Sequence, residues 1–531
     1  MTQVDVLVVG GGLGGVAAAL GALRRGRRVL LTEEHAWLGG QLTSQGVPPD
    51  EHAWVEQFGV TAGYRALRDG IRDYYRRHYP LTEAARRDRW LNPGSGTVSR
   101  LCAEPRVAVA VLEQMLAPYR STGQLTVWQP WVPTAAETSE DVVRSVTLRH
   151  TATGAERTVS ADYVLDATEL GDLLPLTGTD HVVGAESTDE HGEPSAPAVA
   201  DPDNVQPITY CFAFDHVEGA DHTIERPAGY DYWREYQPDF WGDRLLSFTA
   251  PNPRTRVPEV RTMVVNPAVP APDADQSVSA GDSDLWTFRR IVARANFVPG
   301  SYDSDVVLAN WPMLDYLDAS VIGADDVAKH LAAARDLSLS YFYWLQTEAP
   351  RPDGGRGWPG LRMRGDVMGT DDGLAMAPYI RESRRIRALT TVTEGDISVD
   401  VRGHGRPATF QDSVGVGMYR IDLHPSTGGD NYIDVPCAPF EIPLGALVPR
   451  RTTNLVAAGK DIGTTHITNG AYRLHPVEWN VGEAAGELAA LCLDTGRTPR
   501  EVATTPELVR QLQDRLVAAG VEIHWPEVLG Y

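Results

Sequence analysis

The chain has 531 residues, 42% of them hydrophobic and 22% charged, which suits a globular protein with two interleaved domains. It contains no apolar run of about 18 residues, and its start has neither the basic region nor the cleavage site of a signal peptide, so we expect no membrane span. A net charge of -23 repels phosphate backbones and argues against a nucleic-acid partner. These features together indicate a cytoplasmic protein.

The four cysteines are far apart and show no spacing of a zinc or iron–sulfur site. Scattered thiols in a long chain favour a reducing compartment, and we expect no bound metal. The cysteines are Cys102, Cys211, Cys437 and Cys492.

The first part of the chain predicts one βαβ unit. Residues 4–9 form a short apolar run typical of a buried parallel strand, residues 16–25 are rich in Ala and Leu and predict a helix, and residues 28–32 predict a second strand. The unit has the expected size of about 30 residues.

Three glycines between the first strand and the helix match the dinucleotide fingerprint G-x-G-x-x-G. Gly10 allows a tight turn, Gly12 lets a pyrophosphate approach the backbone, and Gly15 lets helix and strand pack closely. Glu33 ends the second strand, where an acid accepts hydrogen bonds from a ribose and argues against a 2′-phosphate. A glycine-rich turn without a ligand is the alternative. The cofactor-binding residues predicted in this unit are Gly10, Gly12, Leu13, Gly14, Gly15, Glu33 and Glu34.

The rest of the chain predicts a fold that leaves the nucleotide-binding domain and returns to it. The predicted helices are 61–79, 105–119, 477–493 and 505–519, the last capped by Thr505. The predicted strands are 125–128, 454–458 and the hairpin 142–150 with 156–165. Residues 175–440 lose the βαβ rhythm and are rich in Pro, Asp and aromatic residues. We expect a strand near Val132 to contact an adenine ring.

The residues after Glu33 separate FAD from NAD. Trp37-Leu38-Gly39-Gly40-Gln41 resembles the loop that follows the acid in FAD-dependent oxidoreductases of the glutathione-reductase structural class. The resemblance implies that Gly39, Gly40 and Gln41 lie along the FAD ribose and pyrophosphate.

Four later segments resemble a large bacterial group of FAD-dependent oxidoreductases, which is similar to the flavin-binding part of heterodisulfide reductase. The segments are 164–172, 379–385, 454–461 and 470–486. The further FAD contacts that the resemblance implies are Ala167, Lys460, Asp461, and the backbone N–H groups of Asn480 and Val481. The departures from the family pattern are Glu169 in place of a glycine, the pair Lys460-Asp461, and His475 in place of an apolar residue.

The resemblance implies an α/β fold with a discontinuous Rossmann-type FAD-binding domain and an inserted α+β substrate domain. The boundaries that we predict are 1–174 and 441–497 for the FAD-binding domain, 175–440 for the substrate domain and 498–531 for a helical tail.

The expected catalytic residues lie where the later segments should border the flavin ring. His466 and His475 are candidate bases, because histidine titrates near neutral pH. Arg473 and Arg381 are candidates to bind a carboxylate or the flavin edge. Each histidine can instead be a hydrogen-bonded structural group, and each arginine a member of a buried ion pair. The aromatic cluster at 230–241 predicts either a pocket or a domain core.

These observations predict an FAD-dependent oxidase or dehydrogenase that acts on a small organic molecule and passes electrons to dioxygen or a carrier. The sequence contains no second fingerprint for a separate NAD(P)H domain. The alternatives are a flavin monooxygenase that uses NAD(P)H, a flavin-bearing scaffold, and an NAD-binding protein without flavin. The oligomeric state stays open, with a homodimer as one option.

Overall fold

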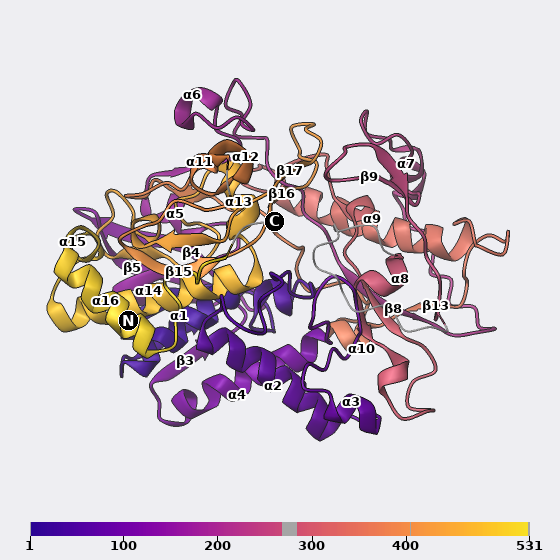
Figure 1. Ribbon diagram of the computed structural model, residues 1–531, viewed down its shortest axis with the longest axis horizontal. Coiled ribbons are helices and arrows are strands. Elements are labelled where there is room, and N and C mark those ends of the chain that lie inside the picture. The colour runs from indigo at the N-terminus through magenta and orange to yellow at the C-terminus, as the bar shows by residue number, and fades with distance from the viewer. Residues whose placement is uncertain (1, 268–283, 404, 529–531) are drawn as a thin grey trace.

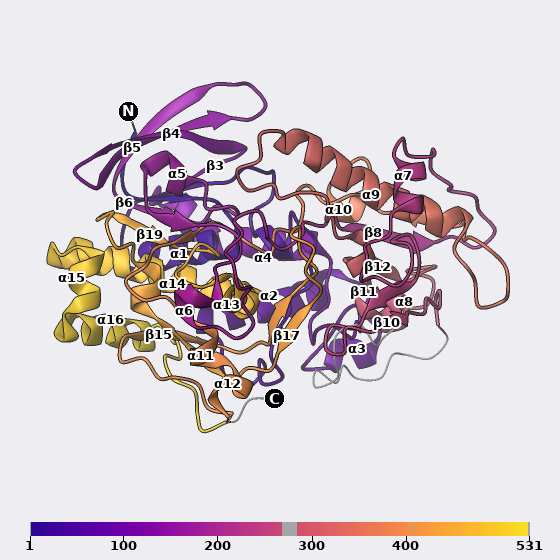
Figure 2. The same cartoon turned by 90° about the horizontal axis from the view of Figure 1, so that it is seen from above.

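The computed structural model describes residues 2–267, 284–403 and 405–528. Most of their buried apolar residues belong to two hydrophobic cores. One core surrounds a large sheet on the left of Figure 1, and the other packs against one face of a smaller sheet on the right, whose opposite face belongs to the first core. Figure 2 shows the same two parts of the molecule from above.

The large sheet has the strand order β3-β2-β1-β6-β5-β4, with β19 paired to β6. The parallel strands are β1 (Thr2–Val9), β2 (Val29–Thr32), β3 (Leu125–Trp128), β6 (Glu156–Asp166) and β19 (Leu455–Ala457). An antiparallel extension is formed by β4 (Trp131–Ser139) and β5 (Val142–His150). The apolar run of β1 is buried at Val6, Leu7 and Val8, as expected for a parallel strand covered on both faces.

Helix α1 (Leu13–Arg24) packs against helix α14 (His475–Thr495) with the two backbones in direct contact. A Cβ atom added to Gly482 would lie 1.9 Å from the carbonyl oxygen of Gly14. A Cβ atom on Gly486 would lie 2.1 Å from the carbonyl oxygen of Ala18. Side chains at these positions would force the helices apart, so the contact depends on glycine.

Other helices cover the large sheet and the end of α14. Helices α2 (Ala62–His78) and α4 (Pro105–Ser121) pack together at the bottom of Figure 1. Helices α15 (Pro499–Thr504) and α16 (Pro506–Ala518) pack against α14.

The smaller sheet has the antiparallel order β11-β12-β8-β13. Its strands are β8 (Phe212–His216), β11 (Arg290–Val292), β12 (Val306–Ala309) and β13 (Leu361–Met363). Helix α9 (Val327–Thr347) contributes to the second core together with β8, β12 and β13. Within the aromatic cluster, Tyr230, Trp233 and Trp241 belong to this core and are at most 3% exposed. These three residues therefore serve the core and not a pocket.

The remaining elements are short. The helices are α3 (Glu83–Arg87), α5 (Leu173–Thr177), α6 (Thr188–His191), α7 (Tyr230–Glu235), α8 (Leu285–Phe288), α10 (Gly365–Met368), α11 (Glu394–Ile397), α12 (Val399–Arg402) and α13 (His466–Tyr472). The paired strands are β7 (His181–Val182) with β14 (Arg385–Ile386), β9 (Thr249–Pro251) with β10 (Pro258–Val260), β15 (Ser413–Gly417) with β18 (Phe440–Pro443), and β16 (Ile421–Leu423) with β17 (Ile433–Val435).

The predicted βαβ unit, the hairpin and the late return of a strand to the sheet are confirmed. Thr505 is the N-cap residue of α16, as predicted, but its side chain accepts no capping hydrogen bond. The neighbouring α15 is the capped helix, since Thr498 accepts from the N–H of Glu501. The junction 466–476 contains the short helix α13, which the sequence did not predict.

The apolar residues of 386–440 pack into the first core and not into the second. Val392, Ile421 and Phe440 are buried there, whereas the second core draws its residues from 208–380. The chain thus returns to the large core earlier than the boundary at 440. The domain boundaries themselves remain predictions.

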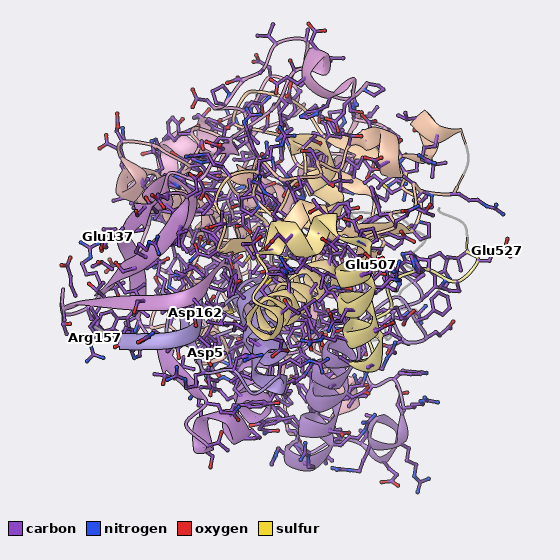
Figure 3. The ribbon with its side chains drawn as sticks, turned by 90° about the vertical axis from the view of Figure 1, so that its left-hand side faces the viewer. Asp5, Glu137, Arg157, Asp162, Glu507 and Glu527 are labelled. Atoms are coloured by element: carbon purple, nitrogen blue, oxygen red, sulfur yellow. The ribbon has the colours of Figure 1, made fainter. Side chains whose placement is uncertain are left out.

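Charged side chains cover the outside of the large sheet and of the C-terminal helices. Figure 3 labels Arg157 and Asp162 on β6 and Glu507 on α16, all exposed. Within residues 2–267, 284–403 and 405–528, no helix combines the length and the apolar character that crossing a membrane requires.

We predict that Gly486→Ala lowers the free energy of unfolding by about 3 kcal/mol or more, because its methyl group meets the Ala18 carbonyl. Urea unfolding followed by circular dichroism measures the change. The matched control is Gly395→Ala, where only a side-chain oxygen at 3.6 Å lies near the new methyl group. Equal stability of the two variants would contradict the prediction.

Candidate functional site

A cavity of ≈ 360 Å³ lies at the carboxyl end of β1, where ligands bind in folds of this type. Its walls combine the glycine loop, the acids after β2, the start of β4 and the segment 376–380. The residues predicted from the sequence that line this first cavity are Gly10, Gly12, Glu33, Glu34, Gly40, Val132 and Ala167.

The glycine loop has the close contacts that the fingerprint predicts. Gly10 has a φ of 98° and a Cβ there would lie 2.2 Å from the Ala167 carbonyl oxygen. A Cβ on Gly15 would lie 1.9 Å from the Gly10 carbonyl oxygen. These positions require glycine for backbone conformation and for packing. Gly12 is the N-cap residue of α1 and lines the cavity.

Glu33 is held beneath the glycine loop. Its carboxylate accepts hydrogen bonds from the backbone N–H groups of Gly11 and His35, each at 2.8 Å. Burial raises the pKa of Glu33 to about 8, although the two N–H groups oppose the shift. The side chain is therefore fixed at the edge of the cavity, at the place where the sequence predicts a ribose.

A buried cluster of charges adjoins the glycine loop. A Cβ on Gly12 would lie 3.0 Å from a carboxylate oxygen of Glu169 and 3.2 Å from one of Glu478. The ammonium group of Lys460 is paired with Glu169 and lies 3.8 Å from Glu478. Burial lowers the pKa of Lys460, but the two carboxylates outweigh burial and raise it. The loop is thus flanked by two carboxylates and one firmly charged ammonium group.

The other predicted cofactor residues do not line the first cavity. They are Leu13, Gly14, Gly15, Gly39, Gln41, Lys460, Asp461, Asn480 and Val481. Gly39 donates from its N–H to the Gly11 carbonyl at 2.8 Å, which fixes the second glycine loop against the first. One oxygen of Asp461 accepts from the Gly459 N–H at 3.1 Å, and the other has no partner among the described residues.

The predicted N–H donors of Asn480 and Val481 disagree with the geometry of α14. Both residues lie in its second turn, where each backbone N–H bonds to the carbonyl four residues earlier. The Asn480 side chain is bonded to β15, with its amide donating to the Val414 carbonyl. The free N–H groups of this helix belong to its first turn, which starts at His475.

A second, smaller cavity of ≈ 60 Å³ contains the two arginines that the sequence singled out. Arg381 and Arg473 both line it, and Tyr379 lies between them with its hydroxyl 2.6 Å from Arg473. Arg381 is paired with the buried Asp315 at 3.0 Å, and Arg473 with Asp422 at 3.3 Å. The structure therefore brings these two predicted residues together.

One short segment separates the two cavities. Pro378 and Ile380 line the first cavity, while Tyr379 and Arg381 line the second. Alternate side chains of extended backbone point in opposite directions, which explains this division. The backbone of this segment therefore runs between the two cavities.

The two histidines expected as bases line neither cavity. His475 is fully buried, with Nδ1 accepting from the Asp50 N–H and Nε2 near the Val47 carbonyl, both at 3.2 Å. Burial lowers the pKa of His475 to about 3. His466 is buried against Glu382, whose carboxylate oxygens lie 3.0 Å from Nδ1. Both rings are engaged in packing and hydrogen bonding. This arrangement favours the alternative that each histidine is a hydrogen-bonded structural group and not a base.

His424 lines the second cavity and was not identified from the sequence. Its Nδ1 lies 2.6 Å from the carboxylate of Asp315, which also accepts from the Thr209 hydroxyl at 2.5 Å. Burial and the positive charge of Arg381 lower the pKa of His424. Burial raises the pKa of Asp315, but Arg381 and His424 outweigh it and lower the pKa. This pattern favours a neutral ring with its proton on Nδ1 and a free lone pair on Nε2.

No local pattern identifies the second cavity in the sequence. Asp50, Arg289 and the pair His424 and Tyr432 come from three distant stretches, and none stands in a recognisable motif with another. The one local signal in this region is weak: Tyr419, His424 and Tyr432 are three ring-bearing side chains within 14 residues.

We predict that His475 stays neutral as the pH falls to about 4, because the buried ring resists protonation. Its folded-state pKa lies below the ordinary value of 6.5, so its contribution to stability is lost as the pH falls from 6.5 towards 3. NMR of ¹⁵N-histidine-labelled protein reads the charge state of each ring. Two ring nitrogens of His475 with imidazolium shifts above pH 5 would contradict this prediction.

The chain matches a known protein family over nearly its whole length and a curated enzyme over a short stretch. A family model described as FAD dependent oxidoreductase matches residues 5–516. A stretch of 34 residues is 71% identical to aklavinone 12-hydroxylase DnrF of Streptomyces peucetius, and covers 6% of this chain and 7% of that enzyme. The curated relative is thus matched over less than a tenth of its length.

Two solved structures show weaker likeness. The p-nitrophenol 4-monooxygenase PnpA from Pseudomonas putida DLL-E4 is 12% identical, with 98% of this chain and 89% of that chain covered and a TM-score of 0.36. The myxobacterial chondrochloren halogenase CndH is 18% identical, with 43% and 46% covered and a TM-score of 0.23. Neither likeness identifies a substrate.

The family match extends over nearly the whole chain, and the features of the first cavity agree with it. The glycine loop, the anchored Glu33 and the opposing Gly40 are the parts that a flavin dinucleotide requires. The chain belongs to the FAD-dependent oxidoreductase family, and its cofactor is FAD.

Proposed function

We propose that this protein oxidises a small organic molecule by two electrons, with FAD in the first cavity and the reacting end of the substrate in the second. The observation that carries the proposal is the segment 378–381, whose alternate residues line the two cavities. Hydride transfer needs direct contact between the flavin ring and the substrate, so the ring would extend past this segment to the mouth of the second cavity.

The residues of the first cavity fit FAD along its length. Val132 would contact the adenine, and Glu33 would accept hydrogen bonds from the ribose hydroxyl groups. Gly12 and Gly40 lie against each other, since a Cβ on Gly40 would lie 2.9 Å from the Gly12 Cα, so a pyrophosphate beside them would meet backbone and no side chain of either residue. Asp461, with one unpartnered oxygen, is the candidate for the ribityl chain.

The charge cluster at the loop must rearrange for a pyrophosphate to bind. The Glu169 side chain is 26% exposed and can turn outward, whereas Glu478 and Lys460 are almost completely buried. Once released from Glu169, the Lys460 ammonium group would neutralise the phosphate charge. The first-turn N–H groups of α14 would add positive potential near the ring.

Bound FAD supplies the two-electron acceptor for a hydride from the substrate, and dioxygen or an electron carrier then takes the electrons. His424 is the proposed general base, which removes the proton from the substrate O–H or N–H through Nε2. Asp315 is a positioning residue, because it orients the ring through Nδ1 and stabilises the imidazolium that forms. Neither His466 nor His475 is placed to act on a ligand in either cavity.

An absorption spectrum and an anaerobic screen test the proposal. The purified protein should carry one flavin per chain, and a substrate should bleach it in the absence of oxygen. Stoichiometric NADPH consumption with oxygen insertion would identify a monooxygenase instead. If the protein keeps its flavin but no compound bleaches it, the result would favour a flavin-bearing scaffold over an oxidoreductase with a small-molecule substrate.

We predict that Gly12→Val abolishes FAD binding, because the larger side chain fills the space of the pyrophosphate. Flavin released by heat from the purified variant should fall below about one tenth of the wild-type content. Gly395→Val is the control outside the loop and should keep its flavin. Full flavin content in a folded Gly12→Val protein would place the phosphate site elsewhere.

We predict that His424→Asn slows anaerobic flavin reduction by a substrate found in the screen by about 10²–10⁴-fold. The Asn amide can still donate to Asp315, so the variant removes the base while it keeps the buried carboxylate paired. Stopped-flow absorbance measures the rate. His524→Asn alters another histidine–carboxylate pair, with Glu441 at 2.7 Å, and should leave the rate unchanged. A wild-type rate in His424→Asn would remove this residue from the mechanism.

A further inference from the structure

The walls of the second cavity carry an excess of hydrogen-bond donors. Five buried donor atoms on its lining residues have no partner among the described residues: Nε of Arg289, Arg381 and Arg473, Nε1 of Trp311 and Oη of Tyr432. Buried polar atoms are nearly always paired in folded proteins. Five such donors around one small space indicate a ligand that accepts hydrogen bonds.

Positive charge also exceeds negative charge around this cavity. The charged residues that line it are Arg261, Arg289, Arg381 and Arg473 against Asp50 and Asp422. A third carboxylate, Asp315, lies behind the wall and is paired with Arg381. Glu259 lies 3.8 Å from Arg261, but its side chain is 41% exposed and water screens its charge. Guanidinium groups therefore outnumber carboxylates in the wall, which favours an anion over a cation as the ligand.

The ion pairs in the wall leave the arginines able to donate further hydrogen bonds to an anion. Asp50 lies 3.9 Å from Arg289, and Asp422 lies 3.3 Å from Arg473. Both distances exceed the value of about 2.8 Å that is typical of a strong charge-assisted hydrogen bond. Burial raises the pKa of Asp50, which weakens its competition for a cation. An additional anion can therefore be bound without displacing a strong pair.

The size and shape of the cavity limit what it accepts. A volume of ≈ 60 Å³ holds on the order of four water molecules, so it suits one functional group with its nearest carbon atoms. The aromatic side chains of Phe288, Trp311 and Tyr419 form apolar parts of the wall. The space thus fits a compact oxyanion on a hydrocarbon or aromatic body, and not a nucleotide.

We propose that the second cavity is an oxyanion-binding site for the substrate, which takes a carboxylate or an enolate-type oxygen of a small molecule. Arg381 and Arg473 supply charge, and Trp311 and Tyr432 supply neutral donors. His424 stands at the same wall, ready to act on the group next to the anion. The identification of the bound anion as the substrate rests on the proposed function, whereas the binding of an anion does not.

Binding of propionate to the FAD-loaded protein tests this site, with propionamide as a neutral probe of the same shape. Ligand-observed NMR titration gives the dissociation constants. We expect propionate to bind at least tenfold more tightly than propionamide, because only the anion neutralises the arginines. Equal affinities would overturn the proposal.

Two conservative variants locate the bound anion. Tyr432→Phe and Trp311→Phe each remove one unpartnered donor, and each should weaken propionate about fivefold. Tyr341→Phe is the matched control, because its hydroxyl donates to the Ser247 carbonyl at 2.8 Å and the residue does not line the cavity. Its affinity should stay within twofold of the wild type. Wild-type affinity in both cavity variants would also overturn the proposal.

A titration of flavin-free protein separates the possible failures. Propionate that binds only when FAD is absent would show that the flavin itself occupies the second cavity, which overturns the site as proposed. Tight, Tyr432-dependent binding in a protein that never takes up FAD would leave the anion site intact and refute the proposed function.

Discussion

The backbone contact between α1 and α14 is the constraint on which the rest of the structure depends. Gly482 and Gly486 lie against the carbonyls of Gly14 and Ala18, so residues more than 460 positions apart behave as one rigid unit. The contact places the first turn of α14 beside the glycine loop, where Glu478 accepts from the Gly14 N–H at 3.2 Å. A dinucleotide site of this kind forms only when the N-terminal glycine loop and the C-terminal helix α14 lie side by side.

Buried charge is concentrated around that unit, and several of the charged groups are compensated by specific neighbours. Glu382 illustrates the pattern: burial raises its pKa, but His466 and Arg385 outweigh burial and lower it. Leaving a charge unpaired in such an environment costs several kcal/mol, so these residues fix one arrangement of the chain. This accounts for a conspicuous histidine such as His466 in a structural position, since the same ring pairs with Glu382 and lines no cavity described above.

The segment 376–381 connects the two cores and gives each cavity part of its wall. It contacts the first core through Gln45, whose side-chain oxygen accepts from the Ile380 N–H, and the second through the bridge between Tyr379 and Thr209. Because both partners are buried, the segment has little freedom to move. The distance between a flavin and a substrate would then be set by the packing of two cores and not by a flexible loop.

The sequence by itself determined the βαβ unit, the glycine loop with Glu33, and the family, because each of these depends on residues close together in the chain. It also selected Arg381 and Arg473, which the structure brings to one cavity. It did not determine which histidine lines a cavity, since His466 and His424 differ in their tertiary neighbours and not in their local patterns. The second cavity was decided by tertiary structure alone, because its walls come from distant stretches that meet only when both cores have formed.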